Sequence, residues 1–350
     1  MKKPLKLLAV VLAVIVLAIG LLVLDVLRSS GTFHSFDADF AGSCAPVALG
    51  GSSEDLQIDA ERGVAYLSLL DRAGLARHEA VTGTIMLLDL NLAQPTARAA
   101  LVYDPPDFRP HGISILRCAN EPLRLFAISH RPDGSHSVEI AEQDANGALV
   151  PKSSVRDPLL VSPNAVVGVG ERQFYVANDR RKGAGTADYL LRRATSTLVY
   201  YDGQHARIVA EGLRFAAGLA ASADGTRLYA GEALGRQMRI YRRDAATGSL
   251  EPDGVVPLDS APDNLRVDAE GMVWIAAHPK LLAFAAHAGD PARRAPTQVL
   301  RFDPRTRQVV QVYGNDGTQL SAGTVAAHWR DEFLIGALMD PRVLICKTNP

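Results

Sequence analysis

The chain of 350 residues has little of what several common protein classes require. Its charge is almost balanced, with 37 basic and 38 acidic residues, so it offers no excess of positive charge for binding nucleic acid. The basic cluster Arg180 to Lys182 is expected to lie on a solvated loop. No G-x-S-x-G motif occurs, which argues against a nucleophilic serine hydrolase. No long amphipathic helix pattern follows Cys44, so an α-helical domain is not predicted.

Cysteine is also scarce, with three residues in the chain. In an oxidising compartment these three could form one disulfide and leave one thiol free. Cys44 and Cys346 lie at the two ends of the folded part, and a bridge between them would close a loop of about 300 residues, worth roughly 4–5 kcal/mol at most. Cys118 lies in an apolar stretch and is expected to be an ordinary buried thiol.

One long apolar run is present, at the N-terminus. Lys2, Lys3 and Lys6 precede the uncharged segment Leu7 to Leu24, which is nearly long enough to cross a bilayer as a helix. A cleaved signal peptide and an uncleaved anchor both fit this pattern, and the length of the run with no A-x-A-like site directly after it favours the anchor. The preceding lysines predict a cytoplasmic N-terminus and a periplasmic or extracellular main domain. The predicted division is a basic tail at 1–6, a transmembrane signal anchor at 7–27, a linker at 28–41 and a folded domain at 42–350.

The rest of the chain carries a degenerate repeat of short β-rich runs separated by turn signals. Six runs combine an aromatic residue with small and apolar residues, at spacings of about 45 to 60 residues, the length of one four-stranded propeller blade. A shorter strand precedes each run, joined to it by turns such as Ala223-Asp224-Gly225. The sequence therefore predicts an all-β fold, a six-bladed β-propeller preceded by an N-terminal transmembrane helix. The ring must be closed, and a Cys44–Cys346 bridge would lock it. The aromatic residues are Tyr66, Phe126, Tyr175, Tyr229, Trp274 and Phe333.

Polar residues recur directly before the six shorter strands. Because the first strand of each propeller blade is the innermost one, these residues should meet at one end of the central channel. The resulting set of carboxylates and amides suits Ca²⁺, which prefers six to eight oxygen ligands, better than zinc. The alternative is a wet channel lined by polar residues without a metal. The six pairs are Glu54-Asp55, His111-Gly112, Asn164-Ala165, Ala217-Gly218, Asp263-Asn264 and Gly323-Thr324.

These pairs lie within longer strings that resemble the paraoxonase/arylesterase family, in order and at similar spacing. The similarity covers roughly residues 40 to 347, and Cys44 and Cys346 fall where that family places its closing disulfide. The strings are Gly51 to Leu56, Arg109 to Ser114, Pro163-Asn164, Phe174 to Asp179, Phe215 to Gly218, Asp263-Asn264 and Ala277 to Pro279.

The resemblance implies a propeller with two stacked calcium ions in its channel, and hydrolysis of lactones and aryl esters at the upper ion. Calcium would stabilise the oxyanion while a histidine activates water. The implied ligands of the upper calcium are Glu54, Asn164, Asp263 and Asn264, and Asp55 is the implied ligand of the deeper, structural calcium. The implied catalytic histidines are His111, as general base or base-orienting residue, and His130, its partner, while His278 is implied as a pocket residue.

Two positions depart from the family pattern. Ala217 stands where the family usually has an asparagine, and water can replace that neutral ligand. Ala165 stands where the family has an aspartate, so the deeper calcium site loses a charge. The remaining six histidines, His136 and His205 among them, are expected to be surface or core residues.

The predicted function is calcium-dependent hydrolysis of small-molecule esters or lactones, by a protein that contacts the membrane through its N-terminal helix and binds no nucleic acid. Two alternatives remain open at this point. One is a sugar-lactone hydrolase of the gluconolactonase-like or strictosidine-synthase-like type. The other is a non-catalytic exported propeller that binds a ligand.

Overall fold

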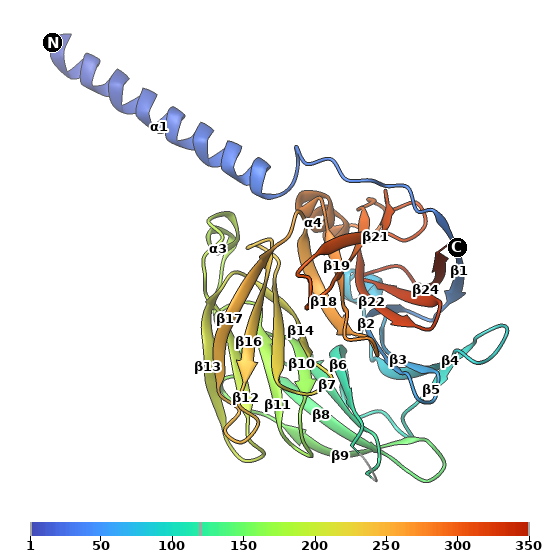
Figure 1. Cartoon of the computed structure of the whole chain (residues 1–350). Coiled ribbons are helices and arrows are strands. Elements are labelled where there is room, and N and C mark those ends of the chain that lie inside the picture. The colour runs from blue at the N-terminus through green and yellow to red at the C-terminus, as the bar shows by residue number, and fades with distance from the viewer. Residues whose placement is uncertain (1, 119–120, 349–350) are drawn as a thin grey trace.

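The computed structural model describes residues 2–118 and 121–348 and confirms the predicted fold. Six four-stranded antiparallel sheets surround a channel, and a long helix, α1, projects from one face of the ring (Figure 1). Met1, residues 119–120 and residues 349–350, which belong to the predicted tail and folded domain, lie outside the described residues.

Each sheet runs outward from an innermost strand, in the chain order that a propeller requires. Blade 1 contains β2 (Ser52–Asp59), β3 (Val64–Leu70), β4 (Thr84–Asp89) and β5 (Ala97–Ala99). Blade 2 contains β6 (Pro110–Leu116), β7 (Arg124–His130), β8 (His136–Gln143) and β9 (Leu149–Val155). Blade 3 contains β10 (Pro163–Gly168), β11 (Phe174–Asn178), β12 (Ser196–Tyr201) and β13 (Ala206–Leu213). Blade 4 contains β14 (Ala216–Ala221), β15 (Arg227–Glu232), β16 (Gln237–Arg243) and β17 (Leu250–Pro257). Blade 5 contains β18 (Ala261–Val267), β19 (Val273–His278), β20 (Thr297–Phe302) and β21 (Val309–Asn315). Blade 6 contains β22 (Gly323–Trp329), β23 (Glu332–Ala337), β24 (Arg342–Thr348) and, from the N-terminal end of the domain, β1 (Gly42–Ala48).

Apolar packing between neighbouring blades holds the ring together. The buried apolar residues form six large clusters, one at each interface between adjacent blades. The six aromatic residues of the predicted repeat are all buried in these clusters. Because burying one such side chain contributes roughly 1.5–3 kcal/mol, the repeat of aromatics is also a repeat of inter-blade contacts.

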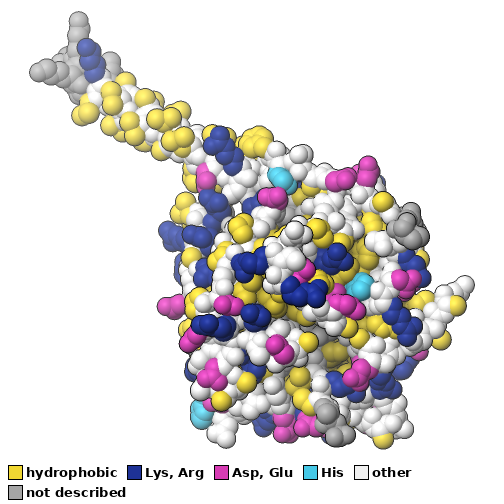
Figure 2. Space-filling model, in the orientation of Figure 1, with side chains coloured by type: hydrophobic (Ala, Val, Ile, Leu, Met, Phe, Trp, Pro, Cys, Tyr) yellow, Lys and Arg dark blue, Asp and Glu magenta, His cyan; other side chains and the backbone are white. Residues whose placement is uncertain are grey.

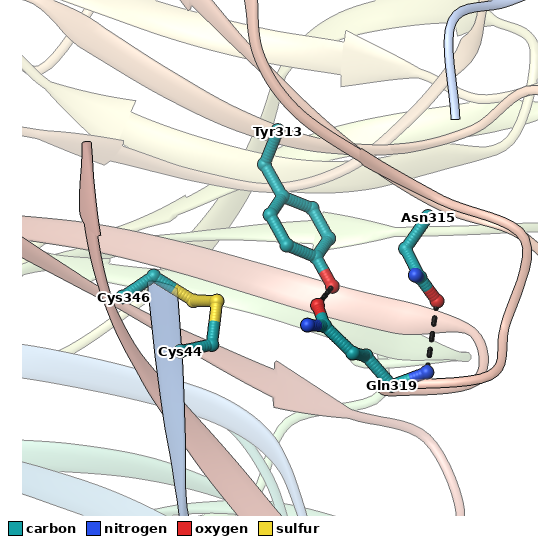
Figure 3. Close-up of a disulfide and its surroundings, with 5 residues drawn as sticks. All are labelled: Cys44, Tyr313, Asn315, Gln319 and Cys346. Carbon is teal, nitrogen blue, oxygen red and sulfur yellow. Dashed lines mark hydrogen bonds between the residues drawn. A yellow bond between two sulfur atoms is a disulfide. The ribbon is translucent and has the colours of Figure 1, made fainter. Parts of the chain in front are cut away.

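The ring closes where the two ends of the folded domain meet. Strand β1 pairs antiparallel with β24, and this register places Cys44 directly opposite Cys346. The two cysteines form the expected disulfide, beside the hydrogen bond from the Tyr313 hydroxyl group to Gln319 Oε1 (Figure 3). Cys118 is a free thiol, and it is half-buried rather than buried as expected.

Helix α1 (Lys2–Ser29) contains the predicted membrane segment. Its part from Lys6 to Ser29 is long and apolar enough to cross a membrane, and its large apolar side chains from Leu7 to Val23 are exposed and stand clear of the propeller (Figure 2). The segment after it lies against the propeller: Lys280 Nζ donates hydrogen bonds to the carbonyl oxygens of Gly31 and Thr32 at 2.9 and 3.1 Å. The base of α1 is therefore held at one face of the ring.

Three short helices lie on this same face. Each connects the second strand of a blade to the third, and second strands end at the face where inner strands begin. These helices are α2 (Arg72–Ala76) in blade 1, α3 (Thr186–Leu190) in blade 3 and α4 (Leu281–Gly289) in blade 5.

Candidate active site

All six inner strands are irregular at the positions where the sequence places polar residues. In each, the pairing register with the second strand shifts, so that the inner strand carries one extra residue. Such β-bulges interrupt the ladder and redirect side chains, which is why these residues face the channel rather than the blade interfaces. The residues within the shifts are Glu54-Asp55, His111-Gly112, Asn164, Ala217, Asp263-Asn264 and Thr324.

A cluster of buried oxygen atoms occupies this end of the channel. Glu54 is 2% exposed and Asn264 is 0% exposed, and Asn264 Nδ2 donates a hydrogen bond to Glu54 Oε1 at 2.8 Å. Three buried oxygens have no hydrogen-bond partner among the described residues: Glu54 Oε2, Asn164 Oδ1 and Asn264 Oδ1. Buried acceptors are rarely left unpaired, and three of them in one place form a set of oxygen atoms that a cation could bind.

Asp263 adds a second carboxylate to the cluster. Its Oδ2 lies 2.8 Å from His278 Nε2, and the His278 ring packs on Phe284 of α4 with ring centroids 3.9 Å apart. His278 is 2% exposed and lines the cavity described below. The imidazole therefore both borders the cavity and fixes the orientation of a carboxylate.

The electrostatics of the cluster disfavour an isolated negative charge. Burial raises the pKa of Glu54 well above its ordinary value, and Asp263 and Asp55 raise it further. Arg72 of α2 lowers it in part; this buried side chain donates a hydrogen bond from Nη2 to the Pro110 carbonyl oxygen at 2.8 Å. A divalent cation among these oxygens would favour the ionised form of the carboxyl groups.

Three histidines form a row beside the cluster. His111 Nδ1 lies 3.7 Å from Glu54 Oε2, and the His111 and His130 rings meet edge to face with centroids 5.0 Å apart. His130 Nδ1 lies 2.9 Å from Nδ1 of His136, which the sequence analysis expected to be an ordinary surface or core residue. Burial lowers the pKa of His111 well below 6.5, and burial and the neighbouring His136 lower that of His130 to about 3. The row is therefore neutral at neutral pH.

Asp55 lies deeper in the channel than Glu54 and is 1% exposed. Its carboxylate is ion-paired with the guanidinium group of Arg266 and accepts a hydrogen bond from the Ile113 backbone N–H at 2.7 Å. The residue for which the family resemblance implies a deeper calcium is therefore bound to a protein cation. The sequence analysis assigned no role to Arg266.

A cavity of about 520 Å³ opens above the oxygen cluster. Glu54, His111, Asn164, Asp263 and His278 line its floor, and its walls are mostly apolar. The walls come from α3, from α4 and from the last turn of α1, three helices that lie close together above the ring (Figure 1).

Two basic residues of blade 3 also face this region. Arg180, expected on a solvated loop, lines the cavity and donates a hydrogen bond from Nη1 to the Tyr189 hydroxyl group at 2.8 Å. Arg192 binds Asp25 of α1 at 2.7 Å, which joins the base of the helix to the cavity wall.

A second group of polar residues lies at the other end of the inner strands. His328 Nδ1 lies 3.5 Å from Asp268 Oδ2, and Glu270 completes a group whose candidate ligand atoms lie within 4.8 Å of one another. Glu270 is exposed and the His328 side chain is half-buried, whereas the Asp268 side chain is buried and already accepts a hydrogen bond from the Trp274 indole at 2.7 Å. The group is far from the cavity and is satisfied by its own contacts.

The missed residues differ in how visible they are in the sequence. His130 and His136 face each other across the β7–β8 hairpin, whose turn contains Pro132-Asp133-Gly134. That turn signal was available and predicts that the residues on either side of it pair. Arg72 and Arg266 have no comparable signal, because their partners come from distant parts of the chain.

Comparisons with known proteins agree with this architecture. The arylesterase family model matches residues 48–348. The chain is 31% identical over 307 residues to serum paraoxonase/arylesterase 1 of Homo sapiens, an alignment that covers 84% of this chain and 85% of that protein. Among solved structures, a luciferin-regenerating enzyme superposes with a TM-score of 0.56 at 15% identity, over 87% of this chain and 95% of that one. A putative gluconolactonase superposes with a TM-score of 0.55 at 15% identity, over 91% and 95%.

Proposed function

Because the chain belongs to the arylesterase family, we propose that it is a calcium-dependent hydrolase that acts on aryl esters and lactones. The observation that supports this proposal most directly is the group of three buried, unpartnered oxygen atoms on the cavity floor. A family of hydrolases, a cavity and a cation-binding chemistry coincide at one end of the channel.

The residues present fit a calcium ion. Glu54 and Asp263 offer carboxylates, and Asn164 and Asn264 offer amide oxygens, the hard ligands that Ca²⁺ prefers. Ala217 contributes only a methyl group, so water would complete the coordination. When bound, calcium would polarise the substrate carbonyl group and stabilise the oxyanion that forms on it.

His111 is the residue that would accept and return the proton during hydrolysis. Its lowered pKa keeps the imidazole neutral, so it can take a proton as a water oxygen attacks the carbonyl carbon. When the ester C–O bond breaks, His111 returns that proton to the departing alkoxide or phenoxide. The His130 ring packs edge-on against the His111 ring and so supports it. The hydrogen bond between His130 and His136 fixes the orientation of the His130 ring.

The cavity walls bear on the substrate class. Phe215, Leu281, Leu282 and Phe284 face a space of about 520 Å³, which suits an aromatic ring or an alkyl chain and gives few partners to a sugar's hydroxyl groups. This is why we place aryl esters and aliphatic lactones ahead of sugar lactones.

We also propose that α1 anchors the protein in a membrane with the propeller on the periplasmic or extracellular side. Residues 1–6 would be the cytoplasmic tail, 7–27 the membrane segment, 28–41 the connection and 42–350 the catalytic domain. The disulfide supports an oxidising compartment, because such bonds rarely persist in the cytosol.

The test uses the full chain in detergent micelles, assayed on aryl acetates and aliphatic lactones with calcium, after chelation, and after calcium is restored. We expect activity to disappear on chelation and to return with calcium. Activity that survives chelation would refute the metal mechanism. If the protein binds calcium but hydrolyses neither aryl acetates nor aliphatic lactones, that result would favour a sugar-lactone hydrolase or a non-catalytic binding propeller.

Two variants with matched controls assign the roles. Asp263→Ala should abolish activity and weaken calcium binding, whereas Glu251→Ala, an exposed acid on β17, should change neither. His111→Gln should retain calcium and lose turnover, whereas His205→Gln, on an exposed turn, should retain both.

A further inference from the structure

Arg266 is a buried cation in the middle of the channel. The residue lies on inner strand β18 and is 6% exposed. Among the described residues, its guanidinium group donates four hydrogen bonds, all to oxygen atoms. Nε donates to the Leu56 carbonyl oxygen at 2.7 Å, and Nη1 donates to the carbonyl oxygen of the adjacent Leu265 at 2.6 Å. Nη2 donates to the Ile113 carbonyl oxygen at 3.2 Å and to the Asp55 carboxylate. One side chain thus joins the inner strands of blades 1, 2 and 5.

These four acceptors form a typical ligand set for a hard cation. A carboxylate and three backbone carbonyl oxygens are the groups that bind divalent ions in many proteins. A guanidinium group has five N–H donors in a fixed plane and stays charged, so it can satisfy several such oxygens without a metal.

We propose that the guanidinium group of Arg266 permanently occupies the second cation position of the channel, so that the chain binds one metal ion, at the upper cluster, and needs none below it. The count of one rests on the proposed function. The exclusion of a deeper ion rests on Arg266 alone.

The balance of buried charge supports this assignment. Glu54, Asp55 and Asp263 are buried acids near the channel, and Arg72 and Arg266 are buried bases close to them. The five groups leave one net negative charge, which a single divalent ion more than offsets. A second divalent ion beside Arg266 would bring uncompensated positive charge into a buried region, which is unfavourable.

The surroundings of Asp55 support it as well. Apart from its ion pair with Arg266, the buried Asp55 carboxylate accepts hydrogen bonds among the described residues from the backbone N–H groups of Leu56, at 2.9 Å, and Ile113, at 2.7 Å, which carry no charge. Ala165, on the inner strand of blade 3, has no oxygen in its side chain, so that strand offers no second carboxylate here. Asp55 therefore depends on Arg266 as its counter-charge.

The experiment counts calcium ions per chain by equilibrium dialysis and elemental analysis, on the full-length protein and on three variants. Arg266→Ala removes the cation and leaves the Asp55 carboxylate and three carbonyl oxygens facing the gap, so the calcium count should rise by one. Arg266→Lys keeps a tethered charge and should leave the count at that of the unmodified chain. Arg266→Ala combined with Asp55→Asn removes both charges, and its count should also equal that of the unmodified chain.

Thermal unfolding gives a readout that does not depend on activity. Chelation should lower the midpoint of Arg266→Ala more than that of the unmodified chain, and the double variant should lose this additional dependence. If Arg266→Ala folds only in the presence of calcium, that result supports the proposal in the same way.

The outcomes separate this proposal from the proposed function. A count of zero in the unmodified chain that rises to one in Arg266→Ala would refute the upper calcium site and leave the role of Arg266 standing. Two ions in the unmodified chain, or no rise in Arg266→Ala, would overturn the role of Arg266 whatever the activity.

Discussion

Replacing His136 with phenylalanine tests whether the row of histidines acts in turnover. The substitution keeps a flat ring in place and removes the nitrogen that lies 2.9 Å from His130 Nδ1. His130 would then hold a buried polar atom without a partner, which costs about 1–3 kcal/mol. If that cost falls on the transition state and not on the enzyme–substrate complex, it corresponds to a roughly 5- to 150-fold loss in kcat.

The pH dependence should change in a defined direction. His136 contributes to the lowering of the His130 pKa to about 3, so its removal should raise that pKa toward 6.5. Steady-state kinetics on an aryl acetate, from about pH 4 to pH 9, should therefore show the acidic decline in kcat at higher pH in the variant. Neither His130 nor His136 lines the cavity, so KM should stay within about twofold.

Two controls keep this prediction testable. His136→Asn restores a hydrogen-bonding group and should recover part of the loss, and His205→Phe, on an exposed turn, should behave as the unmodified chain. An unchanged kcat and pH profile in His136→Phe would refute the role of His136. A rise in KM of the same size as the fall in kcat would point to general distortion of the cavity instead.

Three further predictions concern metal binding and stability. His278→Phe should weaken calcium binding by about 10- to 100-fold, because the carboxylate that it orients loses its partner; a chelator titration measures this, and an unchanged affinity would contradict it. Replacing Cys44 and Cys346 with serine should lower the free energy of unfolding by up to about 5 kcal/mol, since the bridge spans 302 residues; denaturant unfolding should show the same loss when the unmodified chain is reduced. The free energy of unfolding should fall as the pH drops from about 6.5 toward 3, because the unfolded chain takes up protons at His111 and His130 before the folded chain does; a flat profile in urea titrations would refute the lowered pKa values.

The blade pattern was visible in the sequence because it is local. Tyr66 and its five counterparts each sit in a short apolar strand, and such strands are specified by a few neighbouring residues. The polar residues of the ring could be located in the same way, by aligning the inner strands on their first apolar residue. The β-bulges that turn Glu54 and Asp263 toward the channel were not predicted, because a bulge depends on the register between two strands.

The side chains that pair with the site residues could not be predicted from local sequence patterns. Arg266 lies 211 positions from Asp55, and only ring closure brings blades 1 and 5 close enough for the two to meet. In the sequence Arg266 is one charged residue in a short strand, with no indication that its charge is buried. The role of His278 as the partner of Asp263 depends likewise on the pairing of β18 with β19.

The seam between β1 and β24 has a consequence for biogenesis. The strand that completes the sixth blade is translated first, next to α1, whereas its partner is the last strand to leave the ribosome. The four strands of each of blades 1 to 5 follow one another in the chain, but the ring cannot close until β24 has been synthesised, so the closing contact joins the first and last strands of the propeller. A chain that ends before β24 would leave β23 and β1 with unpaired edges, and association with other chains through these edges would compete with folding.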